Sequence, residues 1–326
     1  MKKCLSFLFW KVIHTQINPA ETQGDFMADM TVRETVSALL DREVRPTRMT
    51  VREIGAALWD ITRHYPISAY GILTNGRLFE DIETYCMFIG YRRSGKTLTA
   101  SLLDAHPNVI IANELGVLRY IYAGFNRRQI YYLLLRNSRS FTKAGRRSKG
   151  YSHRIATQFQ GSFKKLLVIG DDPGGGGTLR LCARPWLIDR LYRTIGVRMR
   201  FFHVVRNPYD NISSISKRMD KSLAESIEYY FSLCETVADV KKRLKKDELF
   251  EFRHELFLAE PEDILKKICT FLRVDAPDDY LKDCADIVIR SPHKSRYDIL
   301  WDSSSIDIVK ERMSQFLFLE GYSYED

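Results

Sequence analysis

Residues 85–106 read YCMFIGYRRSGKTLTASLLDAH, and the order of features in this stretch decides the fold. The apolar run Cys86–Ile89 is short enough to be a buried strand. Gly90–Thr97 then matches the pattern G-x-x-x-x-G-K-[ST], which forms a phosphate-binding loop. A helix with leucines on one face follows, and Pro107 must end it. Because free N–H groups and a helix dipole both favour negative charge, this stretch predicts a site for a phosphate-like anion.

Strand-like and helix-like segments alternate through the rest of the chain. The further strands are predicted at Val109–Ala112, Leu166–Ile169, Phe201–Val205 and Leu249–Arg253. The helices are predicted at Glu114–Ala123, Arg127–Arg136, Pro185–Gly196, Leu223–Lys245 and Pro261–Leu272. Residues 137–154 are polar, basic and without period, which predicts an exposed loop. The alternation predicts an α/β fold of three layers, in which helices cover both faces of a mostly parallel central sheet, as in P-loop NTPases.

Ligands of such sheets bind at the carboxyl ends of the strands. The loops at positions 90, 171 and 206 all follow predicted strands. We therefore expect these three loops to meet at one site.

Two T-x-x-E capping patterns precede this domain, at Thr31–Glu34 and Thr50–Glu53. They predict a pair of helices, so residues 1–80 form a mainly helical extension and residues 81–326 the main domain. The helices could cover an edge of the sheet, gate an acceptor pocket or mediate homodimerisation. Packing against the main domain is the role we expect.

The composition and charge of the chain indicate which kinds of partner it can bind. The chain has 50 Lys and Arg against 41 Asp and Glu, a net charge of +9. This excess favours anionic ligands but forms no basic tail of the kind that binds nucleic acid. No apolar run approaches the roughly 20 residues of a membrane span. The six cysteines have no metal-ligand spacing, and together with the lack of a signal peptide they predict a cytoplasmic protein.

One interpretation of the loop is a kinase or NTPase that uses ATP and Mg²⁺. Lys96 would then reach the β- and γ-phosphates, and Thr97 would hold the metal. Asp171 follows a predicted buried strand and would complete the metal shell.

A second set of residues resembles the sulfotransferases that use 3′-phosphoadenosine 5′-phosphosulfate (PAPS). The run RSGKT at 93–97, followed by LLDAHPNV, is similar to the loop of that family that binds the 5′ end of the donor. The strand FFHVV, followed by Arg206-Asn207-Pro208 and by Ser214 eight residues after the arginine, is similar to its 3′-phosphate motif. HELFLAEPEDILKKICTFLRV resembles a later strand-and-helix segment, so the resemblance covers about residues 85–326.

The resemblance implies PAPS as donor, PAP (3′-phosphoadenosine 5′-phosphate) as product and no metal. It implies transfer of a sulfuryl group to a hydroxyl or amine of a small molecule, such as a secondary metabolite. Lys294 and Arg296 resemble a late loop that covers the donor, although a solvated charge run would look the same. The implied donor-binding residues are Arg92, Arg93, Ser94, Gly95, Lys96, Thr97, Leu98, Arg206, Ser214, Lys294 and Arg296.

The loop departs from the family at Lys96, where serine or threonine is usual. Arg93 occupies the position where many members carry the lysine that assists the leaving oxygen. Because that oxygen gains negative charge in the reaction, either cation could serve. The family position favours Arg93.

The acceptor loses a proton, so a general base is expected near the sulfur. Asp171 and Asp172 follow a predicted strand and precede four glycines that would let a substrate approach closely. Asp171 is the preferred candidate. Glu114, after the second strand, and His153, in the basic loop, are the alternatives.

Overall fold

The computed structural model describes residues 51–148 and 150–326. The pattern at Thr31–Glu34 and its helix lie outside these residues. Five strands form one parallel sheet in the order β2-β5-β1-β6-β7. Their bounds are β1 Thr84–Ile89, β2 Val109–Asn113, β5 Val168–Asp172, β6 Arg198–Val205 and β7 Leu249–Arg253. A strand was predicted at each of these five places, and the mostly parallel sheet is confirmed.

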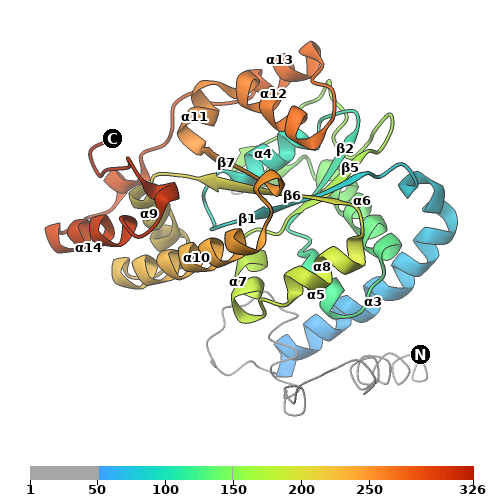
Figure 1. Cartoon of the computed structure of the whole chain (residues 1–326), viewed down its shortest axis with the longest axis horizontal. Helices are drawn as coiled ribbons and strands as arrows, with labels where there is room; N and C mark the ends of the chain where they lie inside the picture. Colours follow the sequence, from blue (N-terminus) through green and yellow to red (C-terminus); the bar gives the residue numbers. More distant parts are fainter. Residues whose placement is uncertain (1–50, 149) are drawn as a thin grey trace.

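Helices cover both faces of this sheet (Figure 1). One face packs against α3 Val51–Asn75, α5 Val117–Tyr122, α6 Arg127–Lys143, α8 Leu187–Ile195 and part of α10 Leu223–Arg243. The other packs against α4 Lys96–Leu103, α11 His254–Ala259, α12 Pro261–Leu272 and α13 Asp278–Asp286. A third cluster joins α10 to α9 Pro208–Met219 and α14 Ser303–Met313. The short 3₁₀ turns are η1 Gly76–Phe79, η2 Lys246–Glu248, η3 Ser295–Asp298 and η4 Leu317–Leu319.

The two faces follow from the alternation of side chains along β1. Tyr85 and Met87 point into the core under α5 and α6, whereas Cys86 and Phe88 point into the core under α4 and α12. A strand that is buried on both faces has no polar alternation, so β1 appears in the sequence as a continuous apolar run.

The segment 137–154 differs from its prediction as an exposed loop. Helix α6 continues to Lys143, and Arg147–Ser148 and Tyr151–Ser152 form a short hairpin, β3–β4. Ser138 is fully buried and donates to the carboxylate of Asp104 at 2.8 Å. This tertiary contact extends the helix through a polar sequence.

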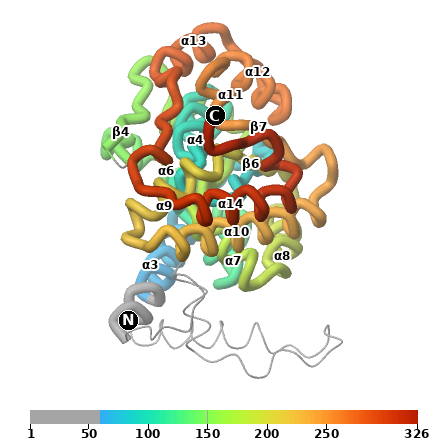
Figure 2. Tube along the Cα trace, turned by 90° about the vertical axis from the view of Figure 1, so that its left-hand side faces the viewer, coloured from blue at the N-terminus to red at the C-terminus, as the bar shows by residue number. Residues whose placement is uncertain are grey.

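The last residues return to the carboxyl edge of the sheet (Figure 2). Tyr322 Oη donates to the backbone oxygen of Val205 at 3.4 Å, and Arg253 donates to the backbone oxygen of Glu320. The C-terminal segment therefore supports the ends of β6 and β7. Among the described residues, no helix combines the length and apolar character that a membrane crossing requires.

Candidate active site

A cavity of about 280 Å³ lies at the carboxyl ends of the strands. All five strands of the main sheet are followed by residues that line it. These residues are Arg92, Arg93, Gly95, Lys96, Thr97 and Leu98 after β1, Glu114 after β2, Asp172, Gly174 and Gly175 at the end of β5, Arg206 after β6 and His254 after β7. The remaining lining comes from Ser148 and the segment Tyr151–His153, and from Leu258, Ile287, Ile289, Ser291, His293 and Ser295.

The loop between β1 and α4 has the conformation that its glycines predict. Gly90 and Gly95 have φ angles of 112° and 96°, in the region that disfavours side chains. A Cβ at Gly95 would lie 2.3 Å from Nδ1 of His254. The Thr178 hydroxyl, in α7 Gly176–Ala183, donates to the backbone oxygen of Gly90 at 2.7 Å. The start of the loop is thus fixed to α7, and its glycine end lies against His254.

The structure brings together the three polar residues on which the resemblance rests. Arg93 Nε donates to the hydroxyl of Ser214 at 2.8 Å, and Arg206 Nη1 donates to the backbone oxygen of Arg93 at 3.1 Å. Burial is the main cause that lowers the pKa of each arginine. In the described part of the chain, Nε of Arg206 is buried and has no hydrogen-bond partner. An anionic ligand would supply one.

Lys96 and Thr97 bind the segment after β5. Lys96 Nζ donates to the backbone oxygen of Gly174 at 2.6 Å, and Thr97 Oγ1 donates to Asp172 Oδ2 at 3.1 Å. The Gly174 N–H donates to Asp172 Oδ1 at 3.1 Å. Asp172, rather than Asp171, thus lies where the NTPase interpretation needs a carboxylate. Within residues 51–148 and 150–326, no group of three or more His, Cys, Asp or Glu side chains could hold a metal.

Asp171 does not line the cavity. Side chains alternate along β5, so Asp171 points away from Asp172 and is fully buried. The N–H of Val117 donates to its Oδ2 at 2.8 Å. Burial raises the pKa of Asp171 to about 7. The preference for Asp171 as general base therefore does not agree with its position, because no acceptor in the cavity reaches it.

Glu114 and His153, the two alternatives, do line the cavity. Glu114 has a φ of 52°, which is uncommon for a residue with a side chain. The bond from its N–H to the backbone oxygen of Asp172, at 2.7 Å, holds this conformation. The Glu114 side chain is exposed. Burial, followed by Arg146, lowers the pKa of His153, so its imidazole is neutral at pH 7.

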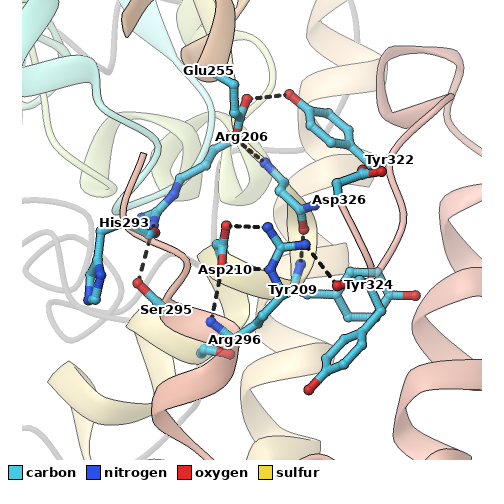
Figure 3. Close-up of polar contacts among 12 residues, drawn as sticks. Arg206, Tyr209, Asp210, Glu255, His293, Ser295, Arg296, Tyr322, Tyr324 and Asp326 are labelled. Atoms are coloured by element: carbon cyan, nitrogen blue, oxygen red, sulfur yellow. Dashed lines mark hydrogen bonds and ion pairs between the residues drawn. The ribbon is translucent and has the colours of Figure 1, made fainter. Parts of the chain in front are cut away.

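The late basic residues do not reach the cavity. Arg296 is buried and forms an ion pair of 2.9 Å with Asp210, while its Nη1 donates to backbone oxygens of the C-terminal segment (Figure 3). Lys294 is exposed and is not among the lining residues. Their neighbours His293 and Ser295 do line the cavity. Arg206 Nη2 donates to the His293 backbone oxygen and, at 3.2 Å, to the Ser295 hydroxyl.

Ser94 is also outside the lining. It is buried, and its hydroxyl donates to the backbone oxygen of Tyr91 at 3.3 Å. Ser94 therefore shapes the loop from within. Leu98, in contrast, forms an apolar wall of the cavity with Leu258, Ile287 and Ile289.

Sequence reasoning missed His254. His254 is half-buried, and its Nδ1 is a buried atom that has no hydrogen-bond partner in the described residues. Burial, followed by the charge of Arg206, lowers its pKa to about 3. His254 directly follows the predicted strand Leu249–Arg253, so the rule that selected the loops at 90, 171 and 206 would have selected it too.

Solved structures that match this chain include several sulfotransferases. STF1 from Mycobacterium tuberculosis is 12% identical, with 97% of this chain and 98% of that chain covered and a TM-score of 0.49. The sulfotransferase domain of the Synechococcus olefin synthase is 16% identical, with 71% and 95% covered and a TM-score of 0.45. Mouse sulfotransferase SULT7A1, solved in complex with PAP, is 12% identical, with 78% and 91% covered and a TM-score of 0.39.

A search of curated protein sequences finds no match to this chain. The sequence does match the sulfotransferase family over residues 87–278, which is more than half of its length and includes the end of β1, the loop, Arg206 and His254. The chain therefore belongs to the sulfotransferase family.

Proposed function

We propose that this protein transfers a sulfuryl group from PAPS to a hydroxyl or amine of a small-molecule acceptor. One observation carries the proposal: the loop after β1 and Arg206 after β6 line the same cavity. PAPS has a phosphosulfate at its 5′ end and a phosphate at its 3′ position, so it needs two separate anion sites. The loop and the start of the helix at Lys96 would bind the 5′ phosphosulfate. Arg206 and Ser214 would bind the 3′-phosphate.

The wall formed by Leu98, Leu258, Ile287 and Ile289 lies in the same cavity as both anion sites. Ligand pockets commonly combine an apolar lining with a few placed polar groups. An adenine ring has two apolar faces and would bury one of them against this wall. The buried Nδ1 of His254 is an additional polar atom that could bind the donor nucleoside.

The reaction needs a cation at the leaving oxygen and a base at the acceptor. The new bond joins the acceptor oxygen or nitrogen to sulfur, and the bond from sulfur to the bridging phosphate oxygen breaks. Lys96 is the better placed cation, because its Nζ lies against Gly174 on the side of Glu114, whereas Arg93 is engaged by Ser214. Glu114 is our candidate base. Both oxygens of Asp172 already accept hydrogen bonds, so Asp172 holds the loop.

A thermal-unfolding series tests the donor. PAP, ADP and ATP are compared with and without Mg²⁺, because a ligand at about 100 times its Kd adds about 2.7 kcal/mol to the free energy of unfolding. We expect PAP to stabilise the protein most, and EDTA to leave that effect intact. The Thr97–Asp172 pair resembles part of an NTPase metal shell. The same series therefore also tests whether the protein is a kinase or NTPase that uses ATP and Mg²⁺. A preference for ATP that requires Mg²⁺ would refute the PAPS proposal.

A further inference from the structure

Gly174 and Gly175, just before α7, leave space for two charged side chains. A Cβ at Gly174 would lie 3.2 Å from Oε1 of Glu114, and a Cβ at Gly175 would lie 2.5 Å from Cγ and 2.8 Å from Nε of Arg92. Glycine at these positions therefore makes room for Glu114 and Arg92. A carboxylate and a guanidinium thus lie against two consecutive glycines, and both residues line the cavity.

Arg92 differs from the other cations of the cavity. Arg93, Lys96 and Arg206 each donate hydrogen bonds within the site. In the described residues, the guanidinium of Arg92 has neither an ion-pair nor a hydrogen-bond partner, and its Nε is buried. Its backbone is fixed, because Asn211 Nδ2 donates to the Arg92 oxygen at 2.9 Å. A buried donor left unpaired is unfavourable, and a planar oxyanion is the ligand that a guanidinium fits best.

An oxyanion could come from the donor or from the acceptor. The two consecutive arginines point to opposite sides of the loop: Arg93 toward Ser214 in α9, and Arg92 toward Gly175 at the start of α7. The donor's 3′-phosphate belongs with Ser214 and Arg206, and the candidate base Glu114 lies on the side of Arg92. The position of Arg92 therefore favours the acceptor as the source.

We infer that Arg92 binds an anionic group of the acceptor, such as a carboxylate, beside the hydroxyl or amine that receives the sulfuryl group. This inference rests on the proposed function. It makes Arg92 a specificity-determining residue that selects acidic acceptors. Glu114, beside Gly174, would then receive the proton of the nucleophile while Arg92, beside Gly175, orients the molecule.

The test uses the full chain and two acceptors that differ mainly in charge, para-hydroxyphenylacetate and para-ethylphenol. PAP binding is first measured by calorimetry, and failure to bind PAP would refute the proposed function rather than this inference. Rates with PAPS are then compared for wild type, Arg92→Gln and the control Arg184→Gln, whose side chain lies over Tyr122 outside the cavity. We expect wild type and the control to prefer the carboxylate by about ten-fold in kcat/KM, and Arg92→Gln to lose that preference.

The measurement of PAP binding distinguishes an anion of the donor from an anion of the acceptor as the ligand of Arg92. If Arg92→Gln weakens PAP binding and leaves the acceptor preference intact, Arg92 serves the donor and the inference fails. If neither phenol is sulfated, both are titrated into the PAP-loaded protein. Binding of the carboxylate that is lost in Arg92→Gln would then support the inference. Equal binding by both proteins, or no binding by wild type, would overturn it.

Discussion

Arg206 and Arg296 are both buried near the same end of the cavity, but only one of them has its charge neutralised by direct contact. Arg296 donates to both carboxylate oxygens of Asp210. Arg206 donates to three uncharged oxygens, those of Arg93, His293 and Ser295. Arg296 therefore acts as a structural clamp, and Arg206 still has a charge that a phosphate can neutralise (Figure 3).

We therefore predict that Arg206→Ala weakens PAP binding by roughly 1.5–3 kcal/mol, the range for a lost charged hydrogen bond. Its effect on adenosine 5′-phosphosulfate, which lacks the 3′-phosphate, should be much smaller. Calorimetric titrations of both ligands measure the difference, with Lys294→Ala as the control outside the cavity. Equal losses for the two ligands would show that Arg206 supports the fold instead.

The two loop cations should differ in their kinetic effects. Lys96→Ala should lower kcat by about 10²–10³, as expected when one donor to the transition state is removed. Arg93→Ala should mainly raise KM for PAPS, because binding that is equal in the ground state and the transition state does not accelerate the chemical step. Steady-state kinetics with one acceptor decide between them, and the reverse assignment would restore the interpretation from the family position.

Asp171 should influence stability and not turnover. Its pKa is about 7 in the folded protein, against an ordinary value of 3.8 for an aspartate in water, so the folded state keeps a proton that the unfolded chain releases. The free energy of unfolding should therefore fall as pH rises from about 4 to about 7, by at most about 4 kcal/mol, and level off above pH 7. Asp171→Asn, which retains an oxygen for the Val117 N–H, should flatten this dependence.

Denaturant unfolding of wild type and Asp171→Asn at several pH values measures the effect. Glu114→Gln is the matched variant inside the cavity. It should lower kcat by about 10²–10⁴, the usual contribution of a general base. If Asp171→Asn loses turnover to the same extent, Asp171 reaches the acceptor after all.

At the scale of elements, the strands could be predicted and some connections could not. Strands β1 and β2 are short apolar runs, because both of their faces are buried. Helix α7 begins within the glycines 176–177, which disfavour helices. It forms because of contacts that no local pattern shows, such as the bonds between Thr178 and Gly90.

Gly170 tests how closely β1 and β5 pack. A Cβ at this position would lie 2.4 Å from Cys86 Sγ and 2.5 Å from the Cys86 backbone oxygen. Because this backbone oxygen can move aside only if β1 itself shifts, we predict that Gly170→Ala lowers the free energy of unfolding by about 1–3 kcal/mol or more. The shift of β1 should also weaken PAP binding at the loop. Gly76→Ala is the control, since the nearest atom there is 3.8 Å away, and equal stability of the two variants would contradict this account.

At the scale of the whole molecule, the parallel sheet determines which parts of the site the sequence could predict. Its carboxyl edge brings together the loops at 90, 171 and 206, as expected. The same expectation failed for Asp171, because a strand end places neighbouring side chains on opposite faces. The segments 151–153 and 287–295 reach the cavity only through tertiary packing, which no local period encodes. The helical extension over residues 1–80, homodimerisation and a cytoplasmic location stay predictions.

The same arrangement predicts which segments are protected from hydrogen exchange when the donor binds. Residues 92–98 and 287–295 are almost 200 positions apart in the chain, and both contribute to the lining of one cavity. Because PAP would contact both, we expect saturating PAP to slow hydrogen exchange in these two segments together. Helix α8 packs on the face of the sheet away from α4 and contributes no residue to the lining, so its amides should exchange at an unchanged rate. Protection confined to residues 92–98 would mean that the apolar wall does not bind the nucleoside, and equal protection of α8 would indicate a global stabilisation instead of a local contact.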